Sequence, residues 1–293
     1  MSRLSRPGVE TVIEARQREL GGLNIRRVLP SRQRQMVGPF IFFDHIGPET
    51  LAPGRGIDVP PHPHIDLATV TYLFEGDLIH RDSLGFVETI RPGEINWMHA
   101  GRGIVHSERT GPELRKKESR IHGIQLWAAL PVEKEDTPPE FQHYSRDDLP
   151  VWSGNGVAGR VLVGEAFGLK SPVRTASPAL YMDVTMAQDS QLEIPDAPER
   201  GVYAVEGTMA LGSEEFGSGK LIVLSRGSDL LLAARSPLRC LILGGAGLAN
   251  ARHIWWNFVS SSLERIQRAK RDWETGRFPE VPGDEGERMP LPG

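Results

Sequence analysis

The feature that most constrains the fold is the shortness of the apolar runs, each of which ends at a turn residue. Turn residues are abundant, with 32 Gly and 23 Pro in 293 residues. Runs such as residues 69–74 and 202–205 are β-branched or aromatic and are followed by Glu-Gly. Short runs of this kind between turn residues are typical of strands rather than long helices. We therefore expect an all-β fold of antiparallel strands that close into barrels.

The same rhythm of strands and turns occurs twice along the chain. In the first half the pattern predicts strands at residues 9–15, 40–45, 69–74, 95–99 and 121–130, with 78–85 as the hairpin partner of 69–74. In the second half it predicts strands at residues 157–164, 179–186, 201–207, 220–224, 229–233 and 238–244. A polar stretch that contains proline separates the two halves. These observations predict a duplicated barrel.

We expect four segments along the chain. Residues 1–132 form an N-terminal domain that binds a metal, and residues 133–150 form a linker. Residues 151–258 form a second barrel without metal ligands, because no histidine occurs between positions 144 and 252. Residues 259–293 form a helix and a tail.

The helix near the C-terminus is predicted from its ends. Ser261-Ser-Leu-Glu is a capping-box pattern, and Gly276 is a typical C-terminal stop. The basic residues of this helix indicate a solvated face, with a partner site as the alternative, and the proline-rich end from Pro279 indicates a loosely packed tail. Three apolar side chains recur near one face: Leu263, Ile266 and Trp273.

Two pairs of candidate ligands stand out, His62 with His64 and His106 with Glu108. Side chains at i and i+2 of a strand project from the same face. If two such strands face each other inside a barrel, the four side chains converge on one point. Three imidazoles and a carboxylate suit a divalent ion such as iron, manganese, nickel or zinc better than calcium or magnesium. We predict a mononuclear metal site held by His62, His64, His106 and Glu108.

The alternatives to ligation are hydrogen bonds. An isolated His-x-His pair can be bonded within a proline-rich loop, and Glu108 can support a ligand from outside the coordination sphere. As alternatives, His45 could support the metal ligands, and His99 and His122 could contact substrate. The remaining histidines of the first half are interpreted as structural: His45, His80, His99, His122 and His143.

Charge and composition exclude several classes of protein. The formal net charge of −4 and the pI of about 6.2 provide no basic field for nucleic acid. No run approaches the roughly 20 apolar residues that span a bilayer, and the N-terminus lacks the apolar core of a signal peptide. Cys240, the one cysteine, lies in an apolar run, so we expect an inert buried thiol, with a reactive one as the alternative. We expect a cytoplasmic monomer, or a nuclear one in a eukaryote, that binds neither nucleic acid nor membrane.

Several segments, in the same order, resemble the pirins, a two-barrel branch of the cupin superfamily. The resemblance covers nearly the whole chain, and its histidine and glutamate segments are the most specific part. The matching segments are Phe40–Pro48, Pro60–His64, Thr69–Gly76, His80–Gly85, Pro92–Met98, Ala100–Glu108, Gly123–Trp127, Trp256–Val259 and Asp272–Phe278.

The resemblance implies two cupin (jelly-roll) β-barrel domains, with the metal in the N-terminal one. In pirins the metal is usually iron, so we expect Fe2+, with Mn, Ni, Co, Cu and Zn as alternatives. The resemblance assigns the ligands to His62, His64, His106 and Glu108. Some pirins are reported to cleave the flavonol quercetin with dioxygen, while others act as transcriptional co-regulators or bind metabolic enzymes.

The chain departs from the family pattern beside the histidine pair. Cupins commonly place a glutamate four residues after the second histidine, where this chain has Ala68, and Ile65 stands where pirins often have arginine. Proton transfer at the metal would therefore use Glu108 or a bound water. Glu108 is the candidate catalytic residue.

Three hypotheses of function follow. The first is an oxygenase of the quercetin 2,3-dioxygenase type that acts on a small phenolic substrate through its metal. The second is a non-catalytic iron-binding protein whose metal redox state controls binding of a regulatory partner, either a transcription factor or a metabolic enzyme. In the third, the metal only stabilises the fold.

Overall fold

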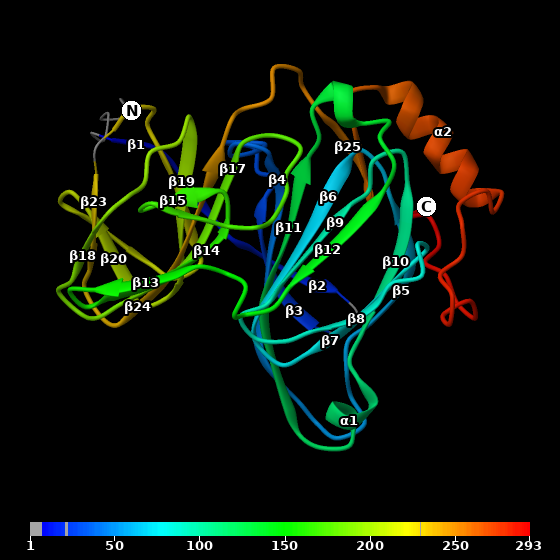
Figure 1. Cartoon of the computed structure of the whole chain (residues 1–293), viewed down its shortest axis with the longest axis horizontal. Helices are drawn as coiled ribbons and strands as arrows, with labels where there is room; N and C mark the ends of the chain where they lie inside the picture. The colour runs from blue at the N-terminus through cyan, green and yellow to red at the C-terminus, as the bar shows by residue number, and fades with distance from the viewer. Residues whose placement is uncertain (1–7, 21–22, 229) are drawn as a thin grey trace. The chain divides into compact units, whose positions relative to one another are not determined.

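Strands dominate the computed structural model, which describes residues 8–20, 23–228 and 230–293 (Figure 1). The helices of this described part are α1 (Pro112–Arg115), the short 3-10 helix η1 (Val132–Lys134) and α2 (Leu263–Glu274). The expectation of an all-β fold with a C-terminal helix is confirmed. None of the helices in these residues is long and apolar enough to cross a bilayer.

The chain forms two compact units, and each is assembled from segments that are far apart in sequence. Among the described residues, unit 1 contains 8–16, 26–43 and 147–248, and unit 2 contains 17–25, 44–146 and 249–293. The units therefore cross the sequence boundaries expected at 132, 150 and 258, and those boundaries stay a prediction about sequence domains.

Unit 2 contains two larger antiparallel sheets and a two-stranded one, and the division between the units falls within β2, β3 and β4. Its strands are β2 (Arg16–Leu20), β3 (Leu23–Leu29), β4 (Phe40–Leu51), β5 (Asp58–His64), β6 (Leu67–Glu75), β7 (Leu78–Asp82), β8 (Val87–Ile90), β9 (Ile95–His99), β10 (Ile104–Arg109), β11 (Ser119–Ala129), β12 (Glu140–Tyr144), β25 (His253–Trp255) and β26 (Phe258–Ser260). One sheet has the order β5-β10-β7-β8, and the other has the order β12-β9-β6-β11-β4-β3-β2. β25 and β26 pair with each other.

Two expectations about unit 2 differ from the structure. β7 was expected to be the hairpin partner of β6, which is wrong, because β7 pairs with β8 and β10 while β6 pairs with β9 and β11. Gly76 lies between them with φ 85°, a conformation that glycine adopts without strain, and the chain passes there from one sheet to the other. In the segment expected to be a linker, β12 pairs with β9 and so belongs to a sheet.

Unit 1 repeats the two-sheet arrangement. Its strands are β1 (Val9–Glu14), β13 (Val151–Gly154), β14 (Val157–Val163), β15 (Glu165–Ala166), β16 (Leu169–Lys170), β17 (Ala179–Met186), β18 (Gln191–Glu193), β19 (Glu199–Glu206), β20 (Thr208–Leu211), β21 (Glu214–Gly217), β22 (Lys220–Leu224), β23 (Leu231–Ala234) and β24 (Leu238–Gly245). The larger sheet has the order β1-β22-β19-β24-β17-β14-β13, and the smaller has the order β18-β23-β20-β21. The chain's first described strand thus completes a sheet made otherwise from its second half.

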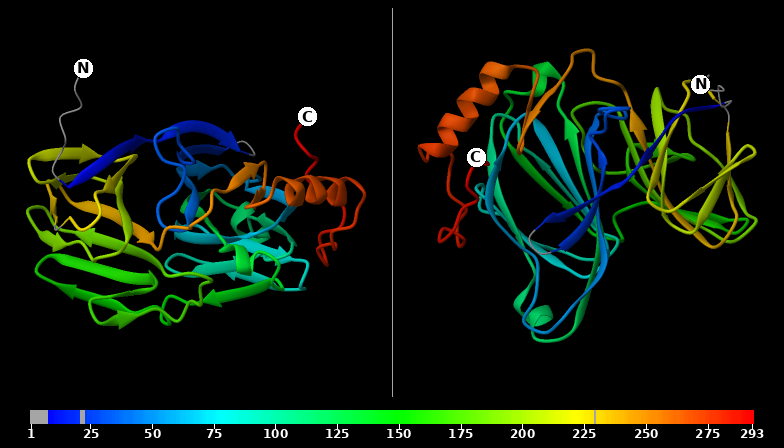
Figure 2. Two further views of the ribbon diagram at one scale, coloured as in Figure 1. Left: turned by 90° about the horizontal axis from the view of Figure 1, so that it is seen from above. Right: turned by 180° about the vertical axis from the view of Figure 1, so that it is seen from behind.

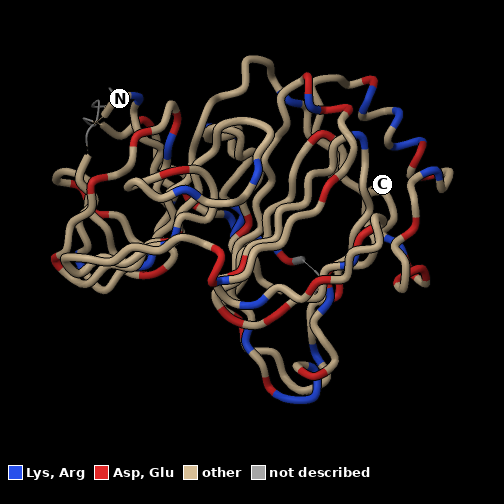
Figure 3. Tube along the Cα trace, viewed as in Figure 1, with Lys and Arg blue, Asp and Glu red and all other residues tan. Residues whose placement is uncertain are grey.

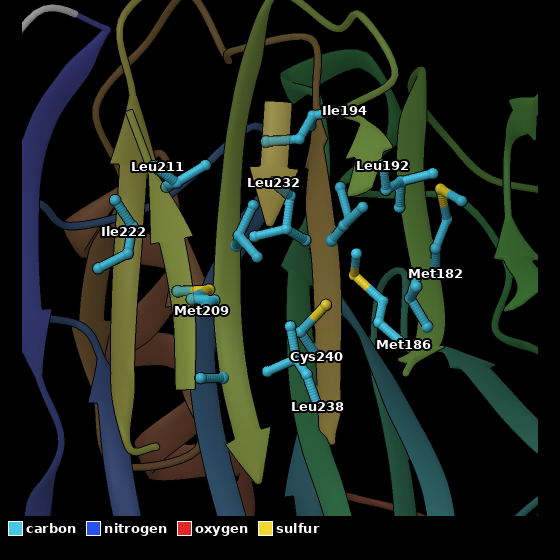
Figure 4. Close-up of a cluster of buried hydrophobic side chains, with 14 of the residues drawn as sticks. Met182, Met186, Leu192, Ile194, Met209, Leu211, Ile222, Leu232, Leu238 and Cys240 are labelled. Atoms are coloured by element: carbon cyan, nitrogen blue, oxygen red, sulfur yellow. The ribbon is translucent and has the colours of Figure 1, made fainter. Parts of the chain in front are cut away.

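The interior of unit 1 is filled with apolar side chains (Figure 4). Met182, Met209 and Leu232 point into it from different strands and are fully buried. Cys240 lies among them, and burial raises the pKa of its thiol, as expected for an inert cysteine. Packed apolar side chains thus fill the interior of this barrel, in agreement with the absence of histidine between positions 144 and 252.

The helix α2 begins one residue later than the sequence pattern predicted. Ser262 is the N-cap, and its hydroxyl accepts the backbone N–H of Arg265. Ser261, the expected cap, instead donates its hydroxyl to the carboxylate of Glu135 at 2.8 Å. The expected stop at Gly276 is confirmed, since the helix ends at Glu274 and Gly276 has φ 69°.

The apolar face of α2 packs against unit 2, and the chain beyond it stays on the same unit (Figure 2). Ile266 and Trp273 are buried as expected, but Leu263 is 59% exposed, so its assignment to this face was wrong. The tail is packed in part, because Val281 is 1% exposed while most of residues 282–293 are exposed. The backbone N–H of Met289 donates to the carbonyl of Pro61 in β5 at 2.9 Å.

A buried ion pair connects α2 to the turn that follows β5. The guanidinium Nε of Arg265 lies 2.7 Å from both carboxylate oxygens of Asp66, which is fully buried. The same guanidinium donates to the backbone carbonyl of Glu135 and to the carboxylate of Asp136. Acidic and basic residues are otherwise interspersed along each unit (Figure 3). The pair of Arg265 and Asp66 is buried, unlike exposed pairs such as Lys116 with Glu113.

Replacing Arg265 with alanine should destabilise unit 2 by about 3–5 kcal/mol, because Asp66 would keep its bond to Ser260 but lose the cation that offsets its burial. Urea unfolding followed by tryptophan fluorescence measures this loss, since five of the six tryptophans belong to unit 2 and only Trp152 belongs to unit 1. Arg268→Ala, on an exposed position of the same helix, is the matched control and should change little. Equal unfolding midpoints for the two variants would contradict the assignment.

Candidate metal centre

Three histidines from two neighbouring strands form the candidate site. The group consists of His62, His64 and His106, whose donor atoms all lie within 4.8 Å of one another. Their ring centroids are 4.3 to 5.0 Å apart, and the three side chains are at most 6% exposed. The sequence predicted strands that face each other across a barrel, but β5 and β10 are adjacent in one sheet, with His62 directly opposite His106.

The prolines around the histidine pair fit the position of β5 at the edge of its sheet. Pro60, Pro61 and Pro63 have no backbone N–H to donate, which an edge strand tolerates and a central strand does not. Their carbonyls remain available as acceptors, and Pro60 uses this role at the site itself.

Each ligand ring is held at Nδ1, which leaves Nε2 for a metal. His62 Nδ1 lies 2.9 Å from the carbonyl of Pro60, and His64 Nδ1 lies 3.0 Å from the carbonyl of Asn257. A carbonyl only accepts, so both rings carry their proton on Nδ1 and keep a lone pair on Nε2. His106 Nδ1 lies 3.4 Å from His80 Nδ1.

A buried atom without a partner marks where a metal would bind. His106 Nε2 is buried and has no hydrogen-bond partner in the described part of the chain. Such an atom is costly to bury, and a metal ion would satisfy it. Three imidazole nitrogens with their second nitrogens bonded are a common donor set for a transition-metal ion. The residues therefore fit the metal that the resemblance implied.

Burial keeps the three imidazoles neutral. It lowers the pKa of His62 to about 4, although the bond to the Pro60 carbonyl raises it and nearby His80 lowers it further. Burial also lowers the pKa values of His64 and His106 well below the usual 6.5, and the neighbouring imidazoles add to this effect. Near neutral pH a metal would therefore displace no proton from these rings.

Glu108 lies apart from the group of three. A register shift between β5 and β10 places Glu108 opposite Val59. The pairing of His106 with His62 therefore does not bring the Glu108 carboxylate into the group. Its carboxylate accepts the hydroxyl of Thr71 at 3.0 Å, and that hydroxyl also lies 3.1 Å from the amide oxygen of Gln125. Burial raises its pKa, and His80 and the Thr71 bond oppose the rise. Ligation by Glu108 stays a prediction.

The other histidines have protein partners, in line with their structural interpretation. His45 and His122 lie with their Nε2 atoms 2.8 Å apart. His99 Nε2 lies 2.8 Å from the hydroxyl of Thr137, and His143 bonds to the Asn96 amide.

The roles of three residues at the site were missed in the sequence, namely those of His80, Asp82 and Asn257. His80 was interpreted as structural, yet it contacts His106, and Asp82 contacts His80 at 3.1 Å. Their i, i+2 spacing, the same as that of His62 and His64, was the available signal. Asn257 acts through its backbone carbonyl, so its residue type carried no signal. Ala68 is fully buried in β6 and brings no carboxylate to its position.

The pH dependence of metal binding should reveal whether Glu108 coordinates. Because the histidine pKa values are lowered, binding of Co2+ should release almost no proton at pH 7. As the pH falls through the raised pKa of Glu108, proton release should rise toward one per metal if Glu108 is a ligand. The slope of log Kd against pH measures this number between about pH 5 and 7.

Glu108→Gln provides the control, because a glutamine has no proton to lose and the slope should then stay near zero. A site of solvent-exposed histidines would instead release up to three protons in this range. A slope of two or three in the unaltered protein would contradict the lowered histidine pKa values.

Known proteins are similar to this chain in sequence and in fold over nearly its whole length. A pirin-like protein of Caulobacter vibrioides is 42% identical over 288 residues, which cover 97% of this chain and 99% of the relative. A protein of Pseudomonas aeruginosa named as a candidate quercetin 2,3-dioxygenase is 42% identical over 286 residues, covering 96% of this chain and 89% of that protein. The crystal structure of quercetin 2,3-dioxygenase from Acinetobacter baumannii matches with a TM-score of 0.90 and 37% identity, covering 97% of this chain and 95% of that one.

Two family models match successive parts of the sequence. The model described as Pirin matches residues 22–128, and the model described as the Pirin C-terminal cupin domain matches residues 181–279. The second match includes α2 and ends at residue 279. The chain therefore belongs to the pirin family, and its two barrels have the cupin fold.

Proposed function

We propose that this protein is a metal-dependent oxygenase that acts on a small phenolic substrate, with quercetin as the model compound. The observation that carries the proposal is the triad of His62, His64 and His106, whose Nε2 atoms remain free while their Nδ1 atoms are bonded. The names of the relatives from Pseudomonas aeruginosa and Acinetobacter baumannii support the reaction class and the substrate class. Glu108 is proposed as the fourth ligand and Fe2+ as the metal, with Mn, Ni, Co, Cu and Zn as alternatives.

The chain's own residues would orient the bound groups, exclude bulk water from the site and supply a general base. The bound ion would supply Lewis acidity and a place where a phenolic oxygen and dioxygen meet. Trp127 packs edge-on against His64 with ring centroids 5.2 Å apart, and the buried rings exclude bulk water from the site. Glu108, whose pKa is raised by burial, would take the proton of the phenolic hydroxyl and return it later. With Ala68 at the usual glutamate position, this role falls to Glu108, with a bound water as the alternative.

Anaerobic loading with Fe2+, followed by quercetin and then air, tests the proposal. We expect oxygen uptake together with loss of the flavonol absorbance, both dependent on the metal. Glu108→Gln should lower kcat by about 10²–10⁴-fold, the range for loss of a general base. Glu113→Gln, at an exposed carboxylate in α1, is the control and should retain full activity.

A complete lack of turnover with Fe2+, Mn2+, Ni2+ and Co2+ would rule out the oxygenase on this substrate. His106→Ala separates this outcome from a missing metal, because its metal content should fall whether or not the protein is catalytic.

A second candidate function is favoured by Ala68, because the site lacks one of the usual acid–base groups of a cupin. In this case the protein binds iron without turnover, and the oxidation state of the iron controls binding of a regulatory protein partner. Fe2+ and Fe3+ differ by one unit of charge, which is a large local change in a buried site. Partner recovery that differs between the two loaded forms would support this function, and equal recovery would contradict it.

The remaining expectations belong to the same proposal. A cytoplasmic location and a monomeric state are proposed, and size-exclusion chromatography with light scattering tests the second of these.

A further inference from the structure

A hydrogen-bonded chain of three side chains leads away from one of the metal ligands. His106 Nδ1 lies 3.4 Å from His80 Nδ1, and His80 Nε2 lies 3.1 Å from Asp82 Oδ2. All three side chains are at most 3% exposed. The register of β10 and β7 places His106 opposite Asp82, and so brings this chain of side chains beside the triad.

The bonds of Asp82 fix the direction of its carboxylate. Oδ1 accepts the backbone N–H groups of Leu84 at 2.9 Å and Phe86 at 3.2 Å. Oδ2 is therefore the oxygen that faces His80. The His80 ring is also held by Phe141, which stacks on it with ring centroids 4.4 Å apart and planes 10° apart.

Only one placement of protons is consistent with a metal at the triad. His106 can offer a lone pair from Nε2 only if its own proton is on Nδ1. His80 Nδ1 must then accept that proton, so His80 carries its proton on Nε2. That N–H points at Asp82 Oδ2, which is an acceptor. The three side chains thus agree on a single direction of donation, from His106 to His80 to Asp82.

We propose that Asp82 and His80 are positioning residues that hold His106 in the tautomer and orientation in which Nε2 binds the metal. His62 and His64 obtain the same restraint from carbonyl groups, which can only accept. His106 obtains it from an imidazole, which could either donate or accept, and Asp82 removes that ambiguity. The proposal rests on metal binding at the triad, and goes beyond the ligands themselves.

Asp82→Asn is the sharpest test, because it should reverse the direction of the chain. The amide oxygen of asparagine can keep the bonds to Leu84 and Phe86, which directs the amide NH2 toward His80 Nε2. His80 would then carry its proton on Nδ1 and donate to His106 Nδ1. His106 would be left with a proton on Nε2, where the lone pair is needed. The same logic explains why an Asp→Asn change impairs a Ser-His-Asp triad without altering its geometry.

The affinity for Zn2+, measured by competition with a chromophoric chelator, should fall about 10–100-fold in Asp82→Asn. Glu113→Gln, at an exposed carboxylate of the same unit, is the control and should bind Zn2+ as the unaltered protein does. His80→Phe keeps an aromatic ring against Phe141 but removes the acceptor, and should lose affinity to a similar degree. His80→Asn should restore most of it, because its amide oxygen lies close to the position of Nδ1.

Nitrogen-15 NMR of the histidine rings gives a readout that needs no metal. In the metal-free protein at pH 7.5, His106 should be protonated on Nδ1, and in Asp82→Asn it should be protonated on Nε2. This measurement keeps the proposal separate from the proposed function: an oxygenase assay can fail while the tautomers agree with the prediction.

Three results would overturn the inference. They are unchanged Zn2+ affinity in both Asp82→Asn and His80→Phe, equal affinities for His80→Phe and His80→Asn, and His106 protonated on Nε2 in the unaltered protein. If Asp82→Asn fails to fold, as judged by circular dichroism, the pair of His80 variants decides.

Discussion

The site depends on one kind of interaction, the hydrogen bond that each ligand histidine makes through its second ring nitrogen. When a histidine that can rotate and exchange tautomers binds a metal, fixing its orientation and its tautomer costs free energy and lowers the affinity. Here Pro60, Asn257 and His80 occupy the Nδ1 atoms of the three rings, so the free nitrogens already point to a common place. The cost of this arrangement is a buried nitrogen, His106 Nε2, that has no partner among the described residues. A metal ion would give this nitrogen a partner.

That interaction draws on parts of the chain that are far apart. Pro60 is a neighbour of the ligands in sequence, but Asn257 belongs to the segment that follows the second barrel's strands. This segment is secured to unit 2 by the apolar face of α2 and by the ion pair of Arg265 with Asp66, two residues after His64. The stability of the C-terminal segment and the orientation of His64 therefore depend on the same contacts. A substitution that weakens the packing of α2 should also disturb the orientation of the His64 ring.

The sequence was sufficient for the elements whose signal is local. Short apolar runs between turn residues predicted β6, β9 and β11, and the spacing of His62, His64 and His106 predicted side chains that meet. It was insufficient where pairing decides the outcome. The sheet that β7 joins, the adjacency of β5 and β10, and the register that moves Glu108 away depend on hydrogen bonds between strands, which leave no local pattern. Asn257 acts through its backbone, and no residue type reveals a carbonyl's partner.

The pairing of β1 with β22 has a consequence for synthesis on the ribosome. β1 is made before every other described strand, yet its partner strand β22 lies near the end of the second barrel. At the usual pace of translation the wait is roughly 10–40 s, far longer than a hairpin needs to form. During this interval β1 has an unpaired edge, and the first barrel lacks the carbonyl of Asn257. Neither unit can be completed before the later part of the chain has been made, so both units must be completed late and at almost the same time.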